Sequence, residues 1–153
     1  TVDPLQVVGT GEIGGFDEAL DTGPPLPGGG GLDIFYRLIR AGKVLVYEPR
    51  YLVFHEHRRS EAALRHQYYT WGTGFMAFVT KSYRNDPPAR ARFRRLIVWW
   101  LRDQITQLSR SIRRKHVLPL SMIWAEFCGG IVGLSGEYER SLRRTAAIRK
   151  RFP

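Results

Sequence analysis

The spacing of apolar residues predicts long helices in the second half of the chain. Between residues 60 and 83, apolar side chains recur every three or four positions and so share one face of a helix. Gly72 and Gly74 fall within one turn of that helix and indicate close packing or a bend. After a break over residues 85–88, apolar positions from Phe93 to Ile112, with arginines around them, predict a basic amphipathic helix.

Two further segments extend this helical pattern toward the end of the chain. The stretch from Pro119 to Leu134 is apolar and close to the minimum length for a membrane span, but it contains Glu126 and three glycines. We therefore expect a buried or interfacial helix there and no transmembrane helix. Residues 138–150 return to a basic helical pattern.

The first half of the chain shows shorter patterns separated by loops. Residues 1–31 contain nine glycines and four prolines, which predict a loop with little regular structure. Asp33 stands where a helix N-cap belongs, and the apolar spacing after it predicts a short helix over 34–41. Runs of β-branched and aromatic residues over 44–47 and 51–54 predict two short strands.

Length and composition indicate one folded domain. The chain has 153 residues, of which 43% are hydrophobic and 12% aromatic, and this is enough apolar surface to bury a core. Its single cysteine, Cys128, excludes an internal disulfide and a multi-cysteine zinc site. The sequence begins at Thr1 without an initiator Met or a signal-peptide pattern, so we expect part of a longer gene product.

Charge is distributed very unevenly along the chain. The formal net charge is +10, yet residues 1–33 carry six acidic residues and no Lys or Arg. The basic remainder is typical of surfaces that contact phosphates or anionic lipid. We do not expect nucleic acid as a partner, because no helix-turn-helix, Cys/His finger or RNP-like pattern occurs. The basic helix, with Trp99 and Trp100, suits a membrane surface, or equally a helix packed on its own domain with arginine stems covering apolar surface.

Four local patterns, in this order along the chain, resemble the second half of the catalytic domain of family 2 glycosyltransferases, which have the GT-A fold. Residues 14–20 are similar to the GGFDE-type acceptor segment of that family, and residues 33–37 to its D-L-x-x-R helix. Residues 55–60 match its H-x-H-R segment, and residues 67–74 resemble its glutamine and glycine-rich helix. Together the patterns cover about residues 13–75, half of the chain.

The resemblance implies an α/β fold in two parts. Residues 1–84 would be the acceptor-side half of a GT-A domain with two short strands, and residues 85–153 a mainly helical, basic tail. The family's nucleotide-binding half and its D-x-D metal motif lie upstream of the GGFDE-type segment, and no D-x-D triplet occurs in this sequence. The implied activity is inverting transfer of a sugar from a nucleotide sugar to an acceptor hydroxyl by a longer parent protein. The chain alone should be inactive.

Partners and cofactors follow from the same resemblance. The parent would use a nucleotide-sugar donor, a sugar or lipid-linked acceptor, and a divalent metal, Mg or Mn, which this chain alone should not bind tightly. The expected location is the cytoplasm, with the basic tail peripheral at the inner face of the cell membrane. The competing hypothesis is a non-catalytic basic module that docks on an anionic membrane or on a partner protein.

Three residues are candidates for catalysis, acceptor binding and metal binding. Asp33 is the carboxylate nearest to the family's catalytic base, since Gly30-Gly31 replace the E-D pair that precedes it there. It is our candidate general base; as an N-cap it would only accept backbone N–H bonds. Asp17 would bind acceptor hydroxyls or satisfy its own turn. His55 corresponds to the family's late metal ligand, although histidines near strand ends are also common as satisfied polar groups.

Two arginines and two residues of the predicted helix complete the candidate site. Arg58 and Arg59 would hold a diphosphate through bidentate hydrogen bonds or remain solvated charges. Gln67 and Trp71 approach the Q-x-x-R-W pattern, whose Gln and Trp contact the acceptor in processive family members, with Thr70 in place of the Arg. Trp71 also fits the apolar stripe of the predicted helix, where it would pack in the core.

Overall fold

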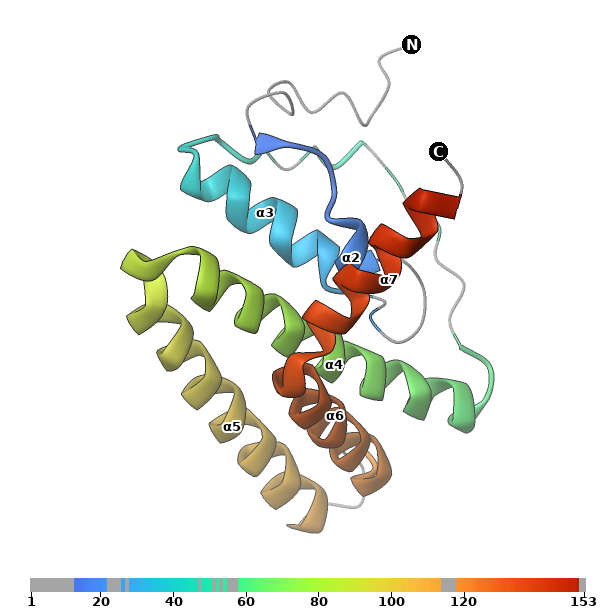
Figure 1. The fold of residues 1–153 in the computed structure, drawn as a ribbon. Helices are drawn as coiled ribbons and strands as arrows, with labels where there is room; N and C mark the ends of the chain where they lie inside the picture. The colour runs from blue at the N-terminus through green and yellow to red at the C-terminus, as the bar shows by residue number, and fades with distance from the viewer. Residues whose placement is uncertain are drawn as a thin grey trace.

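The computed structural model describes residues 13–21, 26, 28–46, 48–50, 52, 54, 58–113 and 118–151, and within them the structure is all-α (Figure 1). The long helix α4 is central, with α3 along one side and α5 and α6 along the other (Figure 1). In chain order the helices are α2 (Glu18–Asp21), α3 (Gly30–Arg40), α4 (Glu61–Asn85), α5 (Arg90–Arg113), α6 (Leu120–Val132) and α7 (Tyr138–Arg151), with a 3₁₀ turn η1 (Pro87–Ala89) before α5 and a π-turn η2 (Gly133–Glu137) before α7.

The predicted α/β class, with two strands in a partial GT-A half, is wrong: the described residues contain no strand. Val44 and Val46, in the first predicted strand, are 86% and 83% exposed and belong to no regular element. Leu52 and Phe54, the described part of the second, are also exposed and outside any strand. Such residues favour strands only where a neighbouring strand pairs with their backbone and one face is buried. The described part of the chain provides no such neighbour.

Helix α3 begins three residues before Asp33, so the prediction of Asp33 as the N-cap is wrong. Gly29 is the N-cap, and the Asp33 N–H already donates to the Gly29 carbonyl oxygen at 3.1 Å. The backbone of Gly29 also passes so close to α4 that a Cβ there would lie 2.9 Å from the carbonyl oxygen of Gly74. This contact between distant segments fixes the start of α3, and no local sequence pattern marks it.

Helices α4 and α6 cross with their backbones in contact. A Cβ on Gly72 would overlap the carbonyl oxygen of Glu126, and a Cβ on Gly129 would overlap that of Tyr69. Because protein interiors are close-packed, neither overlap could be relieved without separating the helices. Of the two roles expected for these glycines, close packing or a bend, the contacts show close packing, and α4 continues through them to Asn85.

The core lies where α3, α4, α5 and α6 meet. Trp100 of α5 stacks on Phe127 of α6, with ring centroids 6.0 Å apart and ring planes 5° apart. Tyr36 of α3 packs edge-on against Phe78 of α4 and Phe93 of α5. Aromatic contacts thus join all four helices. The main buried cluster consists of Met76, Phe78, Val79, Ala89, Phe93 and Trp100.

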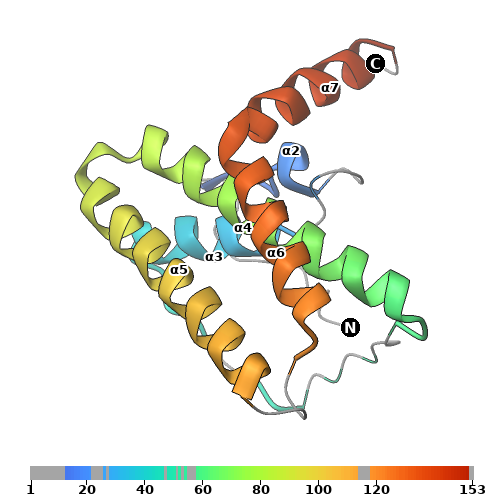
Figure 2. The same ribbon diagram turned by 90° about the horizontal axis from the view of Figure 1, so that it is seen from below.

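Helix α6 forms the apolar stretch for which we predict a buried or interfacial helix. Met122 and Ile123 are buried, whereas Trp124 is 67% exposed. None of the helices in the described residues combines the length and the hydropathy that crossing a bilayer requires. After α6, Gly136 adopts a positive φ of 87°, and α7 leaves the bundle in a new direction (Figure 2).

Candidate functional site

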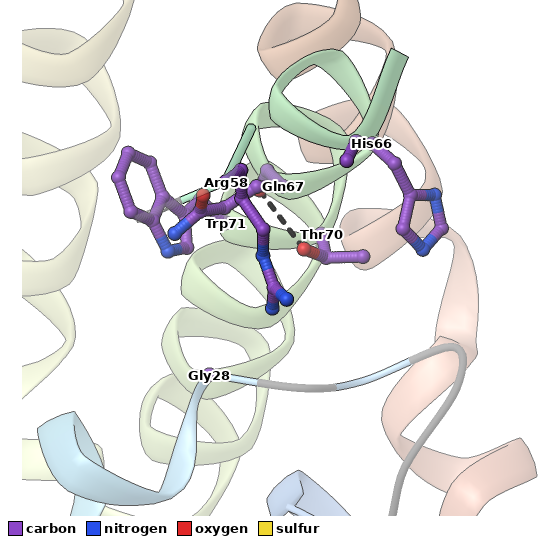
Figure 3. A pocket seen from close by; sticks show the side chains of 7 residues that line it. Gly28, Arg58, His66, Gln67, Thr70 and Trp71 are labelled. Atoms are coloured by element: carbon purple, nitrogen blue, oxygen red, sulfur yellow. Dashed lines mark hydrogen bonds between the residues drawn. The ribbon is translucent and has the colours of Figure 1, made fainter. Parts of the chain in front are cut away.

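A cleft of about 460 Å³ lies over the first turns of α4 (Figure 3). The positions 63, 66, 67 and 70 line it and are three or four residues apart, so they share one face of the helix. Sequence reasoning does not select four of the lining residues, Gly28, Ala63, His66 and Thr70. The four-residue spacing from His66 to Thr70 is the signal available for the histidine, whereas nothing local marks Gly28. The lining consists of Gly28, Arg58, Ala63, His66, Gln67, Thr70 and Trp71.

Trp71 presents part of its indole to this cleft. The side chain is 47% exposed, and Tyr68 packs edge-on against it with ring centroids 5.2 Å apart. On the loop before α3, Gly28 comes close enough that a Cβ there would lie 3.8 Å from Trp71 Cδ1. In the view of Figure 3, the indole lies on one side of the Arg58 side chain and the His66 imidazole on the other. Trp71 is therefore a surface residue with packed neighbours, not part of the buried core.

Polar groups form the rest of the lining. The Thr70 hydroxyl donates to the Gln67 carbonyl oxygen at 2.9 Å, so it is engaged within the helix (Figure 3). His66 is exposed and stacks on Tyr69 with ring planes 19° apart. The Gln67 side-chain amide and the Arg58 guanidinium add further donors and one acceptor. Among the described residues, no carboxylate lines this cleft.

The cleft unites part of the set of residues predicted from the sequence. Arg58, Gln67 and Trp71 all line it. Arg59 is exposed beside Arg58 but does not line the cleft. His55, the candidate metal ligand, lies outside the described residues. The two candidate carboxylates are elsewhere.

Asp17 and Asp33 lie together on either side of Lys81, in a cluster that we call the Lys81 network. The Lys81 Nζ is 2.7 Å from Asp17 Oδ2 and 2.6 Å from Asp33 Oδ1. The Arg37 Nε donates to the other oxygen of Asp33 at 2.8 Å, and the Tyr138 hydroxyl donates to Asp17 at 2.9 Å. These five residues join the segment before α2 to α3, α4 and α7.

Electrostatics keep Asp17 ionised in this network. Burial alone would raise the pKa of its carboxyl, but the hydrogen bond and positive charge of Lys81 and the hydroxyl of Tyr138 outweigh burial and hold the pKa below its ordinary value of 3.8. Burial, with the Asp17 carboxylate, raises the pKa of Tyr138 above its ordinary value, so this hydroxyl stays protonated and donates.

The surroundings of Asp33 are those of an anchor between helices. Its side chain is 2% exposed, and both of its oxygens are engaged, one by Lys81 and the other by Arg37. A general base needs a carboxylate oxygen that is free to take the proton of the acceptor hydroxyl, and both oxygens of Asp33 already bond to cations. Arg37 extends the anchor, because its guanidinium also donates to the carbonyl oxygens of Ile13 and Gly15.

A divalent metal belongs to the chemistry that the family resemblance implies, and the described residues do not fit one. They contain no group of three or more His, Cys, Asp and Glu side chains placed to hold a metal ion. Where Asp17 and Asp33 come together, the ammonium group of Lys81 already lies between their oxygens.

Comparisons with known proteins do not assign this chain to a family. Protein-family models, curated protein sequences and solved structures all gave no match to it. The resemblance to family 2 glycosyltransferases therefore stays a hypothesis that depends on the order of local motifs. The cleft and the Lys81 network are independent of that hypothesis, because they are defined by contacts within the structure.

Proposed function

We propose that this chain is the acceptor-binding part of an inverting, family 2-like glycosyltransferase, and that the cleft over α4 holds the acceptor sugar. The observation that supports this proposal is the convergence of Arg58, Gln67 and Trp71 on one cleft. These residues come from two separate sequence motifs, the H-x-H-R segment and the glutamine and glycine-rich helix. Both motifs thus contribute to a single cavity.

The lining of the cleft suits a sugar ring. A pyranose has C–H groups on its faces and hydroxyls around its edge, so it stacks on an exposed indole while its hydroxyls bond to polar groups nearby. Trp71 provides the indole, Gln67 an amide that both donates and accepts, and His66 an imidazole. The cavity volume of about 460 Å³ is within the range of small-ligand sites.

The chain's part in the reaction is to bind and orient the acceptor. In an inverting transfer, a base takes the proton of the acceptor hydroxyl while its oxygen attacks the anomeric carbon of the donor and the nucleoside diphosphate departs. The Arg58 guanidinium at the cleft is suited to bond the diphosphate through two parallel N–H groups. Because no carboxylate lines the cleft among the described residues, we expect no transfer by this chain alone. We place the parent's activity in the cytoplasm.

Acceptor binding is tested on the full chain by saturation-transfer NMR with short oligosaccharides of glucose, galactose, mannose and N-acetylglucosamine. We expect at least one of them to bind, and Trp71→Ala to weaken that binding about tenfold because the stacking surface is lost. Trp71→Phe should keep most of the affinity. Trp99→Ala removes an indole that is 59% exposed on α5 and is the matched control. Failure of every oligosaccharide to bind, or equal binding by Trp71→Ala, contradicts the proposal.

A further inference from the structure

Helices α5 and α6 enclose an apolar groove that the described residues leave uncovered. Its volume is about 580 Å³. Ile105 of α5 and Trp124 of α6 line it and are 66% and 67% exposed. Apolar side chains gathered in an open groove favour contact with another apolar surface. Apart from Gln104, the lining is apolar and includes Leu101, Ile105 and Leu108 of α5 and Leu120, Trp124 and Phe127 of α6.

An arginine row runs along α5 beside this groove, formed by Arg95, Arg102 and Arg113. These residues are seven and eleven positions apart, which brings them to one side of the helix. At 100° per residue, that side lies about a third of a turn from Leu101 and faces away from the buried Trp100. All three arginines are exposed, and none of them forms an ion pair with another described residue.

The charges of α7 are used differently from those of α5. On α7, Arg140 and Arg144 both pair with Glu137, at 2.7 and 3.0 Å, and Glu137 is buried. Helix α5 has seven arginines and a single acidic residue, Asp103. Most of its positive charge is therefore open to an anionic partner from outside the chain.

We propose that the groove and the arginine row dock this chain on an anionic membrane surface, with lipid acyl chains in the groove and lipid phosphates on the arginines. Charge complementarity favours this occupant over a partner helix. A helix seated in the groove would contact the apolar side of α5, formed by Leu101, Ile105 and Leu108. It would leave the arginine row uncovered, because the row lies on a different side of α5. A lipid bilayer would cover both surfaces, with acyl chains in the groove and headgroup phosphates on the arginine row. Long basic side chains can extend from an apolar surface to the level of the phosphates.

Co-sedimentation of the full chain with vesicles tests this proposal. Vesicles of phosphatidylcholine alone are compared with vesicles that also contain phosphatidylglycerol, at low and at high salt. We expect binding only to the vesicles with phosphatidylglycerol, and release as salt screens the charges. Equal binding to neutral vesicles, or no binding to either, overturns the proposal.

Two charge-matched double variants separate the arginine row from net charge. Arg102→Gln/Arg113→Gln removes two charges from the row, and Arg143→Gln/Lys150→Gln removes two from exposed positions of α7. We expect the α5 variant to lower the vesicle partition coefficient about 30-fold, which is roughly fivefold for each arginine near an anionic surface. The α7 variant should lower the partition coefficient less than about threefold, because Arg143 and Lys150 belong neither to the groove nor to the arginine row. Equal losses overturn the proposal.

A second pair of variants tests the groove itself. Ile105→Ser changes a groove residue that is 66% exposed, and Ile148→Ser changes an α7 residue that is 53% exposed. Both positions are open, so circular dichroism should show unchanged helix content. We expect only Ile105→Ser to weaken vesicle binding, about fivefold, because less apolar surface enters the lipid. Equal binding by the two variants overturns the proposal.

The remaining measurements exclude other occupants. Sedimentation velocity without lipid should show a monomer, and a dimer that only Ile105→Ser disrupts would assign the groove to a second copy and overturn the proposal. Inorganic phosphate at matched ionic strength should not release the chain from vesicles. Selective release by phosphate would show that the arginine row binds free anions, and it would overturn the proposal. Trp71→Ala should bind vesicles like the wild type. A failure of membrane docking is therefore distinguishable from a failure of acceptor binding.

Discussion

The Lys81 network and the arginine row of α5 use similar charged side chains in opposite ways. In the network, Lys81 lies within 2.7 Å of Asp17 and 2.6 Å of Asp33, so its charge is neutralised inside the chain. In the row, Arg102 and Arg113 are exposed and form no ion pair with another described residue. Charges that pair internally hold segments of the chain together, whereas open charges are available to another molecule. The net charge of +10 conceals this difference, because it sums both regions.

Lys81→Met should have the largest effect on stability. It would leave Asp17 and Asp33 facing each other without the ammonium group between them, and Asp33 is only 1% exposed. We expect the free energy of unfolding in urea to fall by about 3–5 kcal/mol, as is typical when one partner of a buried ion pair is removed. Lys150→Met, at an exposed position of α7, is the control. Equal losses in the two variants would show that pairing inside the network does not stabilise the fold.

Acid tests the network separately from the arginine row, because it neutralises the Asp17 carboxylate. The folded chain holds the pKa of Asp17 below its ordinary value of 3.8, so the unfolded chain takes up this proton first as the pH falls. The stability from Asp17 is fully present above that value and is lost below it. In urea unfolding, the wild type should therefore lose stability faster than Asp17→Asn below about pH 4, and the two curves should converge. If the free energies of unfolding of the two proteins instead fell in parallel with pH, the ionised form of Asp17 would not stabilise the fold.

Neutralising the arginine row should have the smallest effect on stability. Arg102→Gln/Arg113→Gln removes charges that are exposed and hold no other segment. We expect the free energy of unfolding to change by less than about 0.5 kcal/mol, as for most surface substitutions. Urea unfolding followed by circular dichroism measures this. A loss as large as that of Lys81→Met would mean that the row stabilises the fold and is not reserved for a partner.

The long helices were predictable because their apolar residues repeat over many turns. The helix predicted over 60–83 corresponds to α4, which spans Glu61–Asn85, and that predicted over 138–150 corresponds to α7, Tyr138–Arg151. The strand predicted over 44–47 failed for a physical reason. A β-branched run is suited to a half-buried, paired surface, and whether a partner strand exists is decided by the whole fold and not by the segment.

In the candidate site, too, contacts between residues close in sequence could be predicted, whereas contacts between distant residues could not. Gln67 and Trp71 are four residues apart on one helix, so their common position followed from local geometry. Lys81 is 48 residues from Asp33 along the chain, and its pairing with Asp33 leaves no periodic pattern to find. For the same reason, the sequence suggested a catalytic or capping role for Asp33, whereas the structure gives it two cationic partners.

At Gly72 and Gly129 the backbones of α4 and α6 lie in direct contact, and such close packing resists displacement of one helix on the other. The cleft is built on the first turns of α4, and the α6 side of the groove on the first turns of α6. The crossing therefore holds cleft and groove at a constant separation. With the groove on a bilayer, the cleft would stand at a fixed height above the lipid, and an acceptor anchored in that bilayer would need a linker of matching length. The absence of a side chain at Gly72 and at Gly129 would in this way determine the distance between the bilayer and the bound acceptor.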